Sequence, residues 1–170
     1  MTVKTEAGAT KRLKEITASV HIFTYAIGVM EVDGWFGRGD QQKGLSECLV
    51  KVKGIGGDYD DMFCFDGGAV CAGIAIDVAA QHYAKARRWN KDKTYGLAKN
   101  HLDLFQTLNG RAPTTGLFRG IANWNDHEVA NYAEMKQGFA TALQALTTEK
   151  ASILRTFPAA GSWNNNETIT

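Results

Sequence analysis

A regular helical spacing of apolar side chains over residues 13–30 constrains the fold of this chain more than any other feature. The intervals alternate between three and four residues, which places the side chains on one face of a helix. Because that face is wide, the helix is expected to pack against more than one neighbour and not in a narrow coiled-coil seam. The face consists of Leu13, Ile16, Val20, Phe23, Ile27 and Met30, widened by Ile22, Ala26 and Val29.

Four later segments also carry helical patterns, and capping residues indicate where they begin and end. Asp33 and Gly34 are expected to end the first helix, because glycine readily adopts the positive φ angles of helix ends. The second helix is expected from Asp40 to Val52, and the third from its cap Asp66 to Ala86. The fourth is expected from Lys93 to Leu108, just before Gly110. The last helix is expected to begin at a capping box formed by Asn125 and Glu128 and to end before Pro158.

These patterns predict an all-α fold, a single-domain bundle of about five helices over residues 1–160. No alternating run of β-branched residues is long enough to indicate a sheet. A long glycine- and aspartate-rich loop is expected over residues 53–65, a connection over residues 111–124, and a polar, mobile tail over residues 161–170. In the third helix the pattern places inward Cys71, Ile74, Val78, His82 and Ala86, with Ala75, Ala79 and Tyr83 beside them.

Net charge, apolar runs and cysteine count limit the partners and the cellular location that we expect for this protein. The net charge of +1 gives no overall attraction to nucleic acid or to a membrane surface. No apolar run approaches the roughly 18 residues of a membrane-spanning helix, so we expect no membrane partner. The three cysteines, Cys48, Cys64 and Cys71, are an odd number, and the first residues are polar. Both features favour a cytoplasmic protein without a classical signal peptide, with a viral particle as the alternative location.

The charges between Gly54 and Lys93 are separated by sign. Asp58, Asp60, Asp61 and Asp66 are not accompanied by any Lys or Arg, whereas five cations follow within nine residues. Guanidinium groups bind phosphate and an exposed tryptophan can stack on an unpaired base, so nucleic acid is one candidate partner. The alternative is a solvated helix end whose cations complement the helix dipole. The predicted binding residues are Lys85, Arg87, Arg88, Trp89, Lys91 and Lys93.

Cys71 is expected near a helix N-terminus, where unpaired amides and the helix dipole favour the thiolate. A catalytic cysteine needs an imidazole within hydrogen-bond reach, and His82 lies roughly 16 Å away along the same helix. His101 and His127 remain as candidate bases. Residues 67–73 resemble the entry to the nucleophile helix of papain-like cysteine peptidases. That resemblance implies a small cysteine hydrolase with Cys71 as nucleophile, and a buried core cysteine is the alternative.

The spacing of acidic and cysteine residues does not support a metal site. A calcium loop starting at Asp58 would place Met62 where an oxygen ligand is needed and Phe63 where the turn needs glycine. Cys64 and Cys71 have no second pair of ligands at zinc-finger spacing. We therefore expect neither a metal ion nor a cofactor.

Two further stretches resemble known families. Residues 56–59 and 66–68 resemble the entry region of phage-type muramidases, but Ile55 stands where that family carries its catalytic acid, which argues against that activity. Residues 104–105 and 116–119, followed by Glu128, resemble coat proteins of flexible filamentous plant viruses at different intervals. Because opposite charges on different surfaces also suit head-to-tail contacts between copies, the sequence predicts a non-enzymatic assembly subunit or partner-binding helical module, present as a homo-oligomer or in a larger complex.

Overall fold

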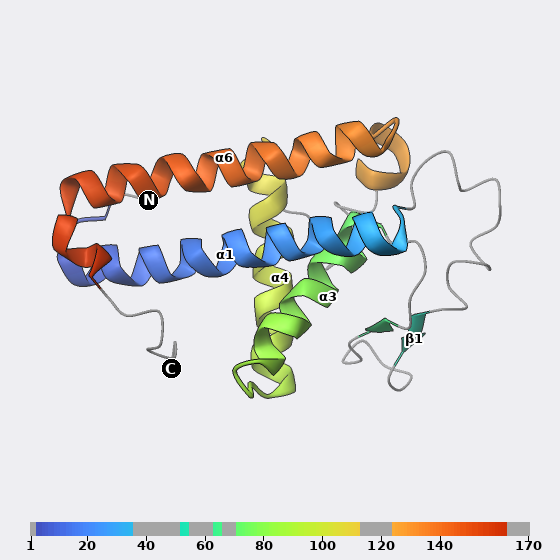
Figure 1. Cartoon of the computed structure of the whole chain (residues 1–170), viewed down its shortest axis with the longest axis horizontal. Helices are drawn as coiled ribbons and strands as arrows, with labels where there is room; N and C mark the ends of the chain where they lie inside the picture. The colour runs from blue at the N-terminus through green and yellow to red at the C-terminus, as the bar shows by residue number, and fades with distance from the viewer. Residues whose placement is uncertain (1–2, 36–51, 55–62, 66–70, 113–123, 163–170) are drawn as a thin grey trace.

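The computed structural model describes residues 3–35, 52–54, 63–65, 71–112 and 124–162 (Figure 1). These residues are mostly helical, as the sequence predicts. Four α-helices lie among them: α1 (Glu6–Asp33), α3 (Ala72–Lys85), α4 (Lys91–Leu108) and α6 (Tyr132–Thr156). A π-helical turn, Trp124–Glu128, precedes α6, and a 3-10 turn, Pro158–Gly161, follows it.

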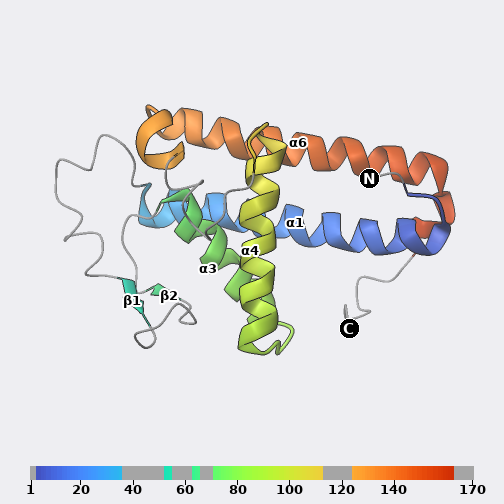
Figure 2. The same ribbon diagram turned by 180° about the vertical axis from the view of Figure 1, so that it is seen from behind.

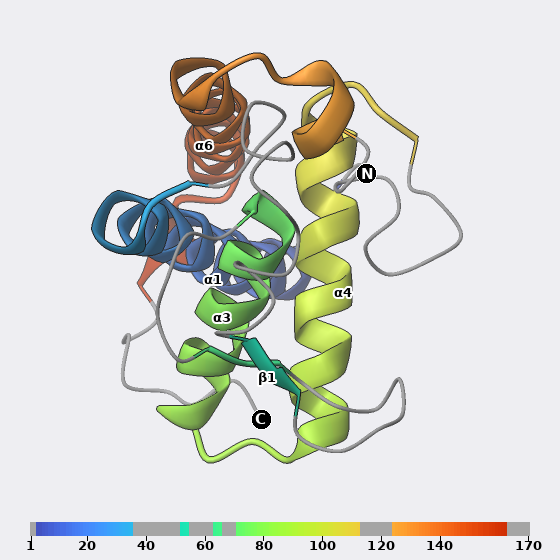
Figure 3. The ribbon, with the colours of Figure 1, turned by 90° about the vertical axis from the view of Figure 1, so that its right-hand side faces the viewer.

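The helices form two pairs that cross each other. α1 and α6 lie side by side along the long axis of the molecule (Figure 1), and α4 crosses behind them, as the reverse view shows (Figure 2). α3 lies between α1 and α4 when the molecule is seen from its end (Figure 3). α1 contacts both α3 and α6, and α4 contacts the same two helices. Among the described residues, no helix lies on the side of α1 that faces away from α4 (Figure 3).

α1 ends where its sequence indicates, and it begins at Glu6, before the first residue of the predicted spacing. The hydroxyl of Thr5 accepts a hydrogen bond from the amide of Gly8 at 3.1 Å, which caps the N-terminus. Gly34 follows the last helical residue with a φ of 93° and donates its amide to the carbonyl of Met30. The predicted inward face is confirmed: the buried residues include Leu13, Ile16, Ile22, Phe23, Ala26 and Met30, and Val20 and Ile27 pack partly buried against the core.

Three aromatic rings from three helices meet at the centre of the core. Phe23 of α1 lies edge-on to Phe105 of α4, with ring centres 5.6 Å apart, and edge-on to Phe139 of α6 at 6.0 Å. The rings of Phe105 and Phe139 are 4.5 Å apart, and all three side chains are fully buried. Such ring pairs contribute about 0.5–1.5 kcal/mol each beyond the burial of their surface. Their meeting fixes the rotation of α1, α4 and α6 about their own axes.

An ion pair joins the two long helices. Nε and Nη2 of Arg12 on α1 each lie 2.8 Å from a carboxylate oxygen of Glu149 on α6. Arg12 also contacts Glu15 one turn along its own helix at 3.0 Å. The hydrogen bonds from Arg12 lower the pKa of Glu149. This two-pronged contact aligns α1 with α6 in the direction along their axes.

α3 presents to the core a face that its sequence pattern predicts only in part. It begins after Cys71, whereas the predicted cap Asp66 lies outside the described residues. His82 and Ala86 are exposed, so their predicted inward position is wrong, whereas Ala75, Ala79 and Tyr83 are buried as predicted. Ile74 and Val78 pack partly buried against the core. Small side chains let α3 approach α1 closely, and the row that it buries is Ala72, Gly73, Ala75, Ile76, Asp77, Ala79, Ala80, Tyr83 and Ala84.

α6 begins six residues later than predicted, after Asn131 and not after Asn125. The side chain of Asn131 accepts a hydrogen bond from the amide of Glu134 at 3.0 Å. The carboxylate of Glu134 accepts one from the amide of Ala130 at 2.9 Å, which completes a reciprocal cap of the capping-box kind. Asn125 belongs to the separate π-helical turn instead.

Several predicted segments fall outside the described residues. They are most of the second helix, most of the glycine- and aspartate-rich loop, residues 113–123 and most of the tail, so the count of five helices is not confirmed. Within the predicted loop region, β1 (Val52–Gly54) pairs antiparallel with β2 (Phe63–Phe65), with Lys53 opposite Cys64. Strands of three residues are too short to give an alternating pattern, so the sequence did not indicate them.

Gly138 provides a test of the packing between α6 and the π-helical turn. A Cβ atom at this position would lie 2.5 Å from a ring carbon of Trp124. One at Gly96 on α4 would meet no atom within 4 Å in the part of the chain that the structure describes. We expect Gly138→Ala to lower the free energy of unfolding by about 1–3 kcal/mol, because the indole must move. Gly96→Ala should raise it by about 0.5–1 kcal/mol through helix propensity. Urea unfolding of both variants makes the comparison, and equal effects would contradict the packing.

Candidate functional site

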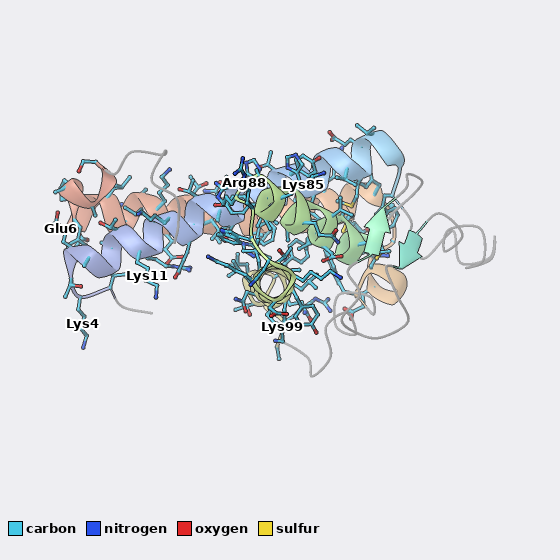
Figure 4. All side chains as sticks on the ribbon, turned by 90° about the horizontal axis from the view of Figure 1, so that it is seen from below. Lys4, Glu6, Lys11, Lys85, Arg88 and Lys99 are labelled. Atoms are coloured by element: carbon cyan, nitrogen blue, oxygen red, sulfur yellow. The ribbon has the colours of Figure 1, made fainter. Side chains whose placement is uncertain are left out.

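The predicted cations gather at the turn between α3 and α4. We call Lys85, Arg87, Arg88, Lys91 and Lys93 the basic turn. Lys85 and Arg88 lie together at the end of α3, while Lys99 lies apart from them on α4 (Figure 4). Four side chains of the basic turn are exposed and Arg87 is half-buried. No carboxylate in the described part of the chain forms an ion pair with any of them, although Asp92 lies in the same stretch.

The backbone of this turn is strained at Arg88. The amide of Trp89 donates to the carbonyl of Ala84 and the amide of Arg88 donates to that of Lys85, each at 3.1 Å. This is a Schellman ending, in which one residue adopts a left-handed conformation. Arg88 takes that position with a φ of 55°, and it is the one non-glycine residue with positive φ in the described part of the chain.

α4 ends in the same motif with a glycine in the left-handed position. The amide of Arg111 donates to the carbonyl of Gln106 at 2.9 Å, and the amide of Gly110 donates to that of Thr107 at 3.0 Å. Gly110 has a φ of 73°. The two helix ends therefore have the same hydrogen bonds and differ in the residue that bears the left-handed conformation.

Trp89 and Arg87, two of the predicted contact residues, are engaged within the protein. The Trp89 ring is half-buried, lies edge-on to Tyr83 with ring centres 6.0 Å apart, and has the Lys93 ammonium 4.1 Å from its centre. The guanidinium carbon of Arg87 lies 3.5 Å from the centre of the Tyr83 ring, and Nη1 donates to the Tyr83 carbonyl at 3.2 Å. These contacts hold the basic turn against the core.

A group of three nearly parallel rings lies beside the basic turn, and the sequence pattern did not indicate it. We call His21 and Tyr25 of α1 and His82 of α3 the ring triad. The centres of Tyr25 and His82 are 4.2 Å apart with 14° between the ring planes, and His21 lies 6.4 and 6.5 Å from the other two. All three residues are exposed. The four-residue spacing of His21 and Tyr25 was the available signal, but His82 was expected to face inward.

The ring triad and the basic turn adjoin each other through Tyr83. The ring of His21 lies 5.4 Å from that of Tyr83, which carries the Arg87 guanidinium. Burial lowers the pKa of His21, and the charges of Arg87 and His82 lower it further. The Arg87 guanidinium therefore lies near enough to His21 to act on it electrostatically, and both groups contact Tyr83.

A groove runs along α1, on the side that no described α-helix covers, and it includes part of the ring triad. Its volume is about 780 Å³. Val32, at one end of it, is 84% exposed, and a Cβ atom added at Gly28 would meet no atom of the described residues within 4 Å. The groove is lined by Thr17, Val20, His21, Thr24, Tyr25, Gly28, Val29 and Val32. The groove thus shares His21 and Tyr25 with the ring triad and has three valines in its lining.

Cys71 lies at the N-terminus of α3, as the sequence predicts. It is half-buried, and its sulfur accepts a hydrogen bond from the amide of Ile74 at 3.5 Å. Beside it, the side-chain oxygen of Asn125 accepts hydrogen bonds from the amide of Ala72 at 3.2 Å and from Nε1 of Trp35 at 2.9 Å. Asn125 thereby links α3, the end of α1 and the π-helical turn.

His101 and His127 were the candidate bases for a thiol mechanism, and the structure describes the side chain of His101 alone. His101 is buried in the core, edge-on to Phe23, with Nδ1 2.8 Å from the carbonyl oxygen of Leu97 and Nε2 3.1 Å from the Ser19 hydroxyl. Both of its ring nitrogens are therefore engaged by groups other than Cys71. The side chain of His127 lies outside the described residues, so its pairing with Cys71 stays a prediction.

Comparison with models of protein families, with curated proteins and with solved structures finds no match. In the described part of the chain, no helix is long and apolar enough to cross a membrane. Over the same residues, no three His, Cys, Asp or Glu side chains form a group that could hold a metal ion. The four aspartates at positions 58, 60, 61 and 66 lie outside it.

Two buried titratable groups give the stability opposite dependences on pH. Burial raises the pKa of Asp77 to about 6, with a partly opposing hydrogen bond from Gln81. Burial lowers the pKa of His101 below its ordinary 6.5. Asp77 therefore stabilises the fold most below pH 3.8 and loses that contribution as the pH rises through 6, whereas the contribution of His101 is lost as the pH falls below 6.5.

Asp77→Asn tests this assignment. Because the variant removes a buried carboxylate, we expect its free energy of unfolding at pH 7.5 to exceed that of the original protein by about 1–3 kcal/mol. The difference should shrink to about a few tenths of a kcal/mol near pH 3.5, where most Asp77 carboxyls are protonated in both the folded and unfolded states. Asp92→Asn, at an exposed position, is the control. Urea unfolding across this pH range measures both, and a pH-independent difference would exclude titration of Asp77 as its cause.

Proposed function

We propose that this protein is a non-enzymatic helical module that binds nucleic acid through the basic turn. The observation that carries the proposal is Arg88 in a left-handed conformation at an exposed helix end. A side chain in that conformation costs about 1 kcal/mol relative to glycine. Strain of this kind persists where a side chain has a use that glycine cannot supply.

The end of α4 shows that the strain is not required by the motif. Gly110 closes that helix with the same pair of hydrogen bonds and without a side chain. At Arg88, the exposed guanidinium instead joins Lys85, Lys91 and Lys93 in a cluster with no paired carboxylate among the described residues. Self-repulsion in such a cluster is relieved by a ligand that carries several negative charges.

Nucleic acid is the polyanion that suits this surface best. Its phosphates repeat at intervals that several neighbouring cations can contact, and their neutralisation releases bound counterions. Guanidinium groups also bind phosphate through two hydrogen bonds at once. The sequence also predicted head-to-tail assembly of copies of this chain. That contact depends on acidic residues outside the described part of the chain, so it stays a prediction. The alternative of a cysteine hydrolase stays a prediction too.

Arg88→Gly separates binding from folding. We expect its free energy of unfolding to differ from that of the original protein by less than about 1 kcal/mol, because glycine relieves the strain as it removes the side chain. Its affinity for an oligonucleotide should fall about fivefold, and the slope of log affinity against log salt should decrease by about 0.7–0.9 for one lost phosphate contact. Fluorescence anisotropy at several salt concentrations provides both numbers.

Lys150→Gln is the matched control, since Lys150 is an exposed cation on α6. It should leave affinity and slope within the error of the original protein. Binding that does not respond to salt, or equal affinities of Arg88→Gly and Lys150→Gln, would contradict the proposal.

A further inference from the structure

We infer that the ring triad is a base-stacking platform, so that the nucleic acid bound by this protein is single-stranded. This inference rests on the proposed function, because the basic turn supplies the contacts to phosphate. It adds a second kind of contact, to the bases, at residues of α1 and α3 that the basic turn does not include.

The geometry of the three rings favours stacking. The planes of His21, Tyr25 and His82 are within 10–19° of one another, although the residues come from two helices. All three are exposed, and Tyr25 has 36% of its surface accessible. Tyr25 and His82 cover one face of each other, so a base stacks on an outer face of this group, and such stacking tolerates any base sequence.

The packing of α3 on α1 holds the rings in place. Tyr83, next to His82, is buried in the core and also contacts His21. The alanine row of α3 brings its backbone close to α1, so His82 lies directly against Tyr25. The platform is therefore built from rigid helices, which limits the conformational entropy lost when a base stacks on it.

The cations are placed to hold the backbone of the same strand. Arg87 lies over the Tyr83 ring and acts electrostatically on His21, so the basic turn adjoins the platform directly. The groove on α1, whose lining includes His21 and Tyr25, also offers apolar walls at Val20, Val29 and Val32. The faces of nucleic-acid bases are largely apolar. Once a base is unpaired and unstacked, contact with an apolar protein surface removes those faces from water. In a duplex these faces are already stacked, and only the phosphates remain for the basic turn.

Tyr25→Leu and Tyr25→Phe test the platform with two ligands. The first is an oligothymidylate of about 15 nucleotides, which carries phosphates and bases. The second is inorganic polyphosphate of similar length, which carries charge without bases. We expect Tyr25→Leu to weaken oligothymidylate binding about tenfold, because one stacking face is lost. Tyr25→Phe, which keeps the ring, should bind within about twofold of the original protein, and polyphosphate should bind all three proteins alike.

A duplex of the same length should compete more weakly than the oligothymidylate. Circular dichroism confirms that each variant is folded, and His82→Leu provides a second ring deletion on the other helix. If Tyr25→Leu and Tyr25→Phe bind the oligothymidylate equally while both ligands still bind, the platform is wrong and the proposed function stands. If neither ligand binds the original protein, the proposed function itself is wrong and the platform with it.

Discussion

The meeting of Phe23, Phe105 and Phe139 is the contact on which the rest of this structure depends. It brings together α1, α4 and α6 at one point of the core and leaves each ring fully buried. Once Phe23 faces inward, the helical period decides where every other residue of α1 points. Residues 17, 21, 24 and 28 must then lie on a different side, and that side has no helix over it among the described residues.

α3 completes the surface because of its small side chains. A row of alanines faces α1, and close approach of the two helices turns His82 outward against Tyr25. The same helix then ends in a tight turn that holds Arg88 in a left-handed conformation and returns the chain into α4. The ring triad and the basic turn are neighbours because His82 and Lys85 both lie in the last turn of α3. The other cations of the basic turn follow directly in the chain.

The sequence allowed prediction of features that depend on residues close together in the chain. The inward face of α1 follows from its three- and four-residue spacing, and the ends at Gly34 and Gly110 follow from glycine at left-handed positions. The start of α6 did not follow, because Asn125 with Glu128 and Asn131 with Glu134 are equally good capping boxes. Only the tertiary contacts of Asn125, which joins Trp35 and Ala72, distinguish them.

The candidate site was predictable in part for the same reason. A cluster of cations within nine residues is visible in the sequence, and the structure places it on the surface. The ring triad is not visible, because it depends on the relative rotation of two helices that residues 34–71 separate in the chain. In the sequence, Ile74 and Val78 form a stronger apolar pattern than the alanines of α3. Because His82 continues that pattern, it was expected to face inward.

The central claim is that one surface, made by α1, α3 and the turn into α4, binds a single nucleic-acid strand. Backbone amide chemical shifts recorded during titration with an oligothymidylate test it most directly. The account predicts that the largest shift changes fall within residues 17–32 of α1 and residues 82–93, while α6 changes little. Changes centred on α6, or the absence of any change at ligand excess, would contradict it.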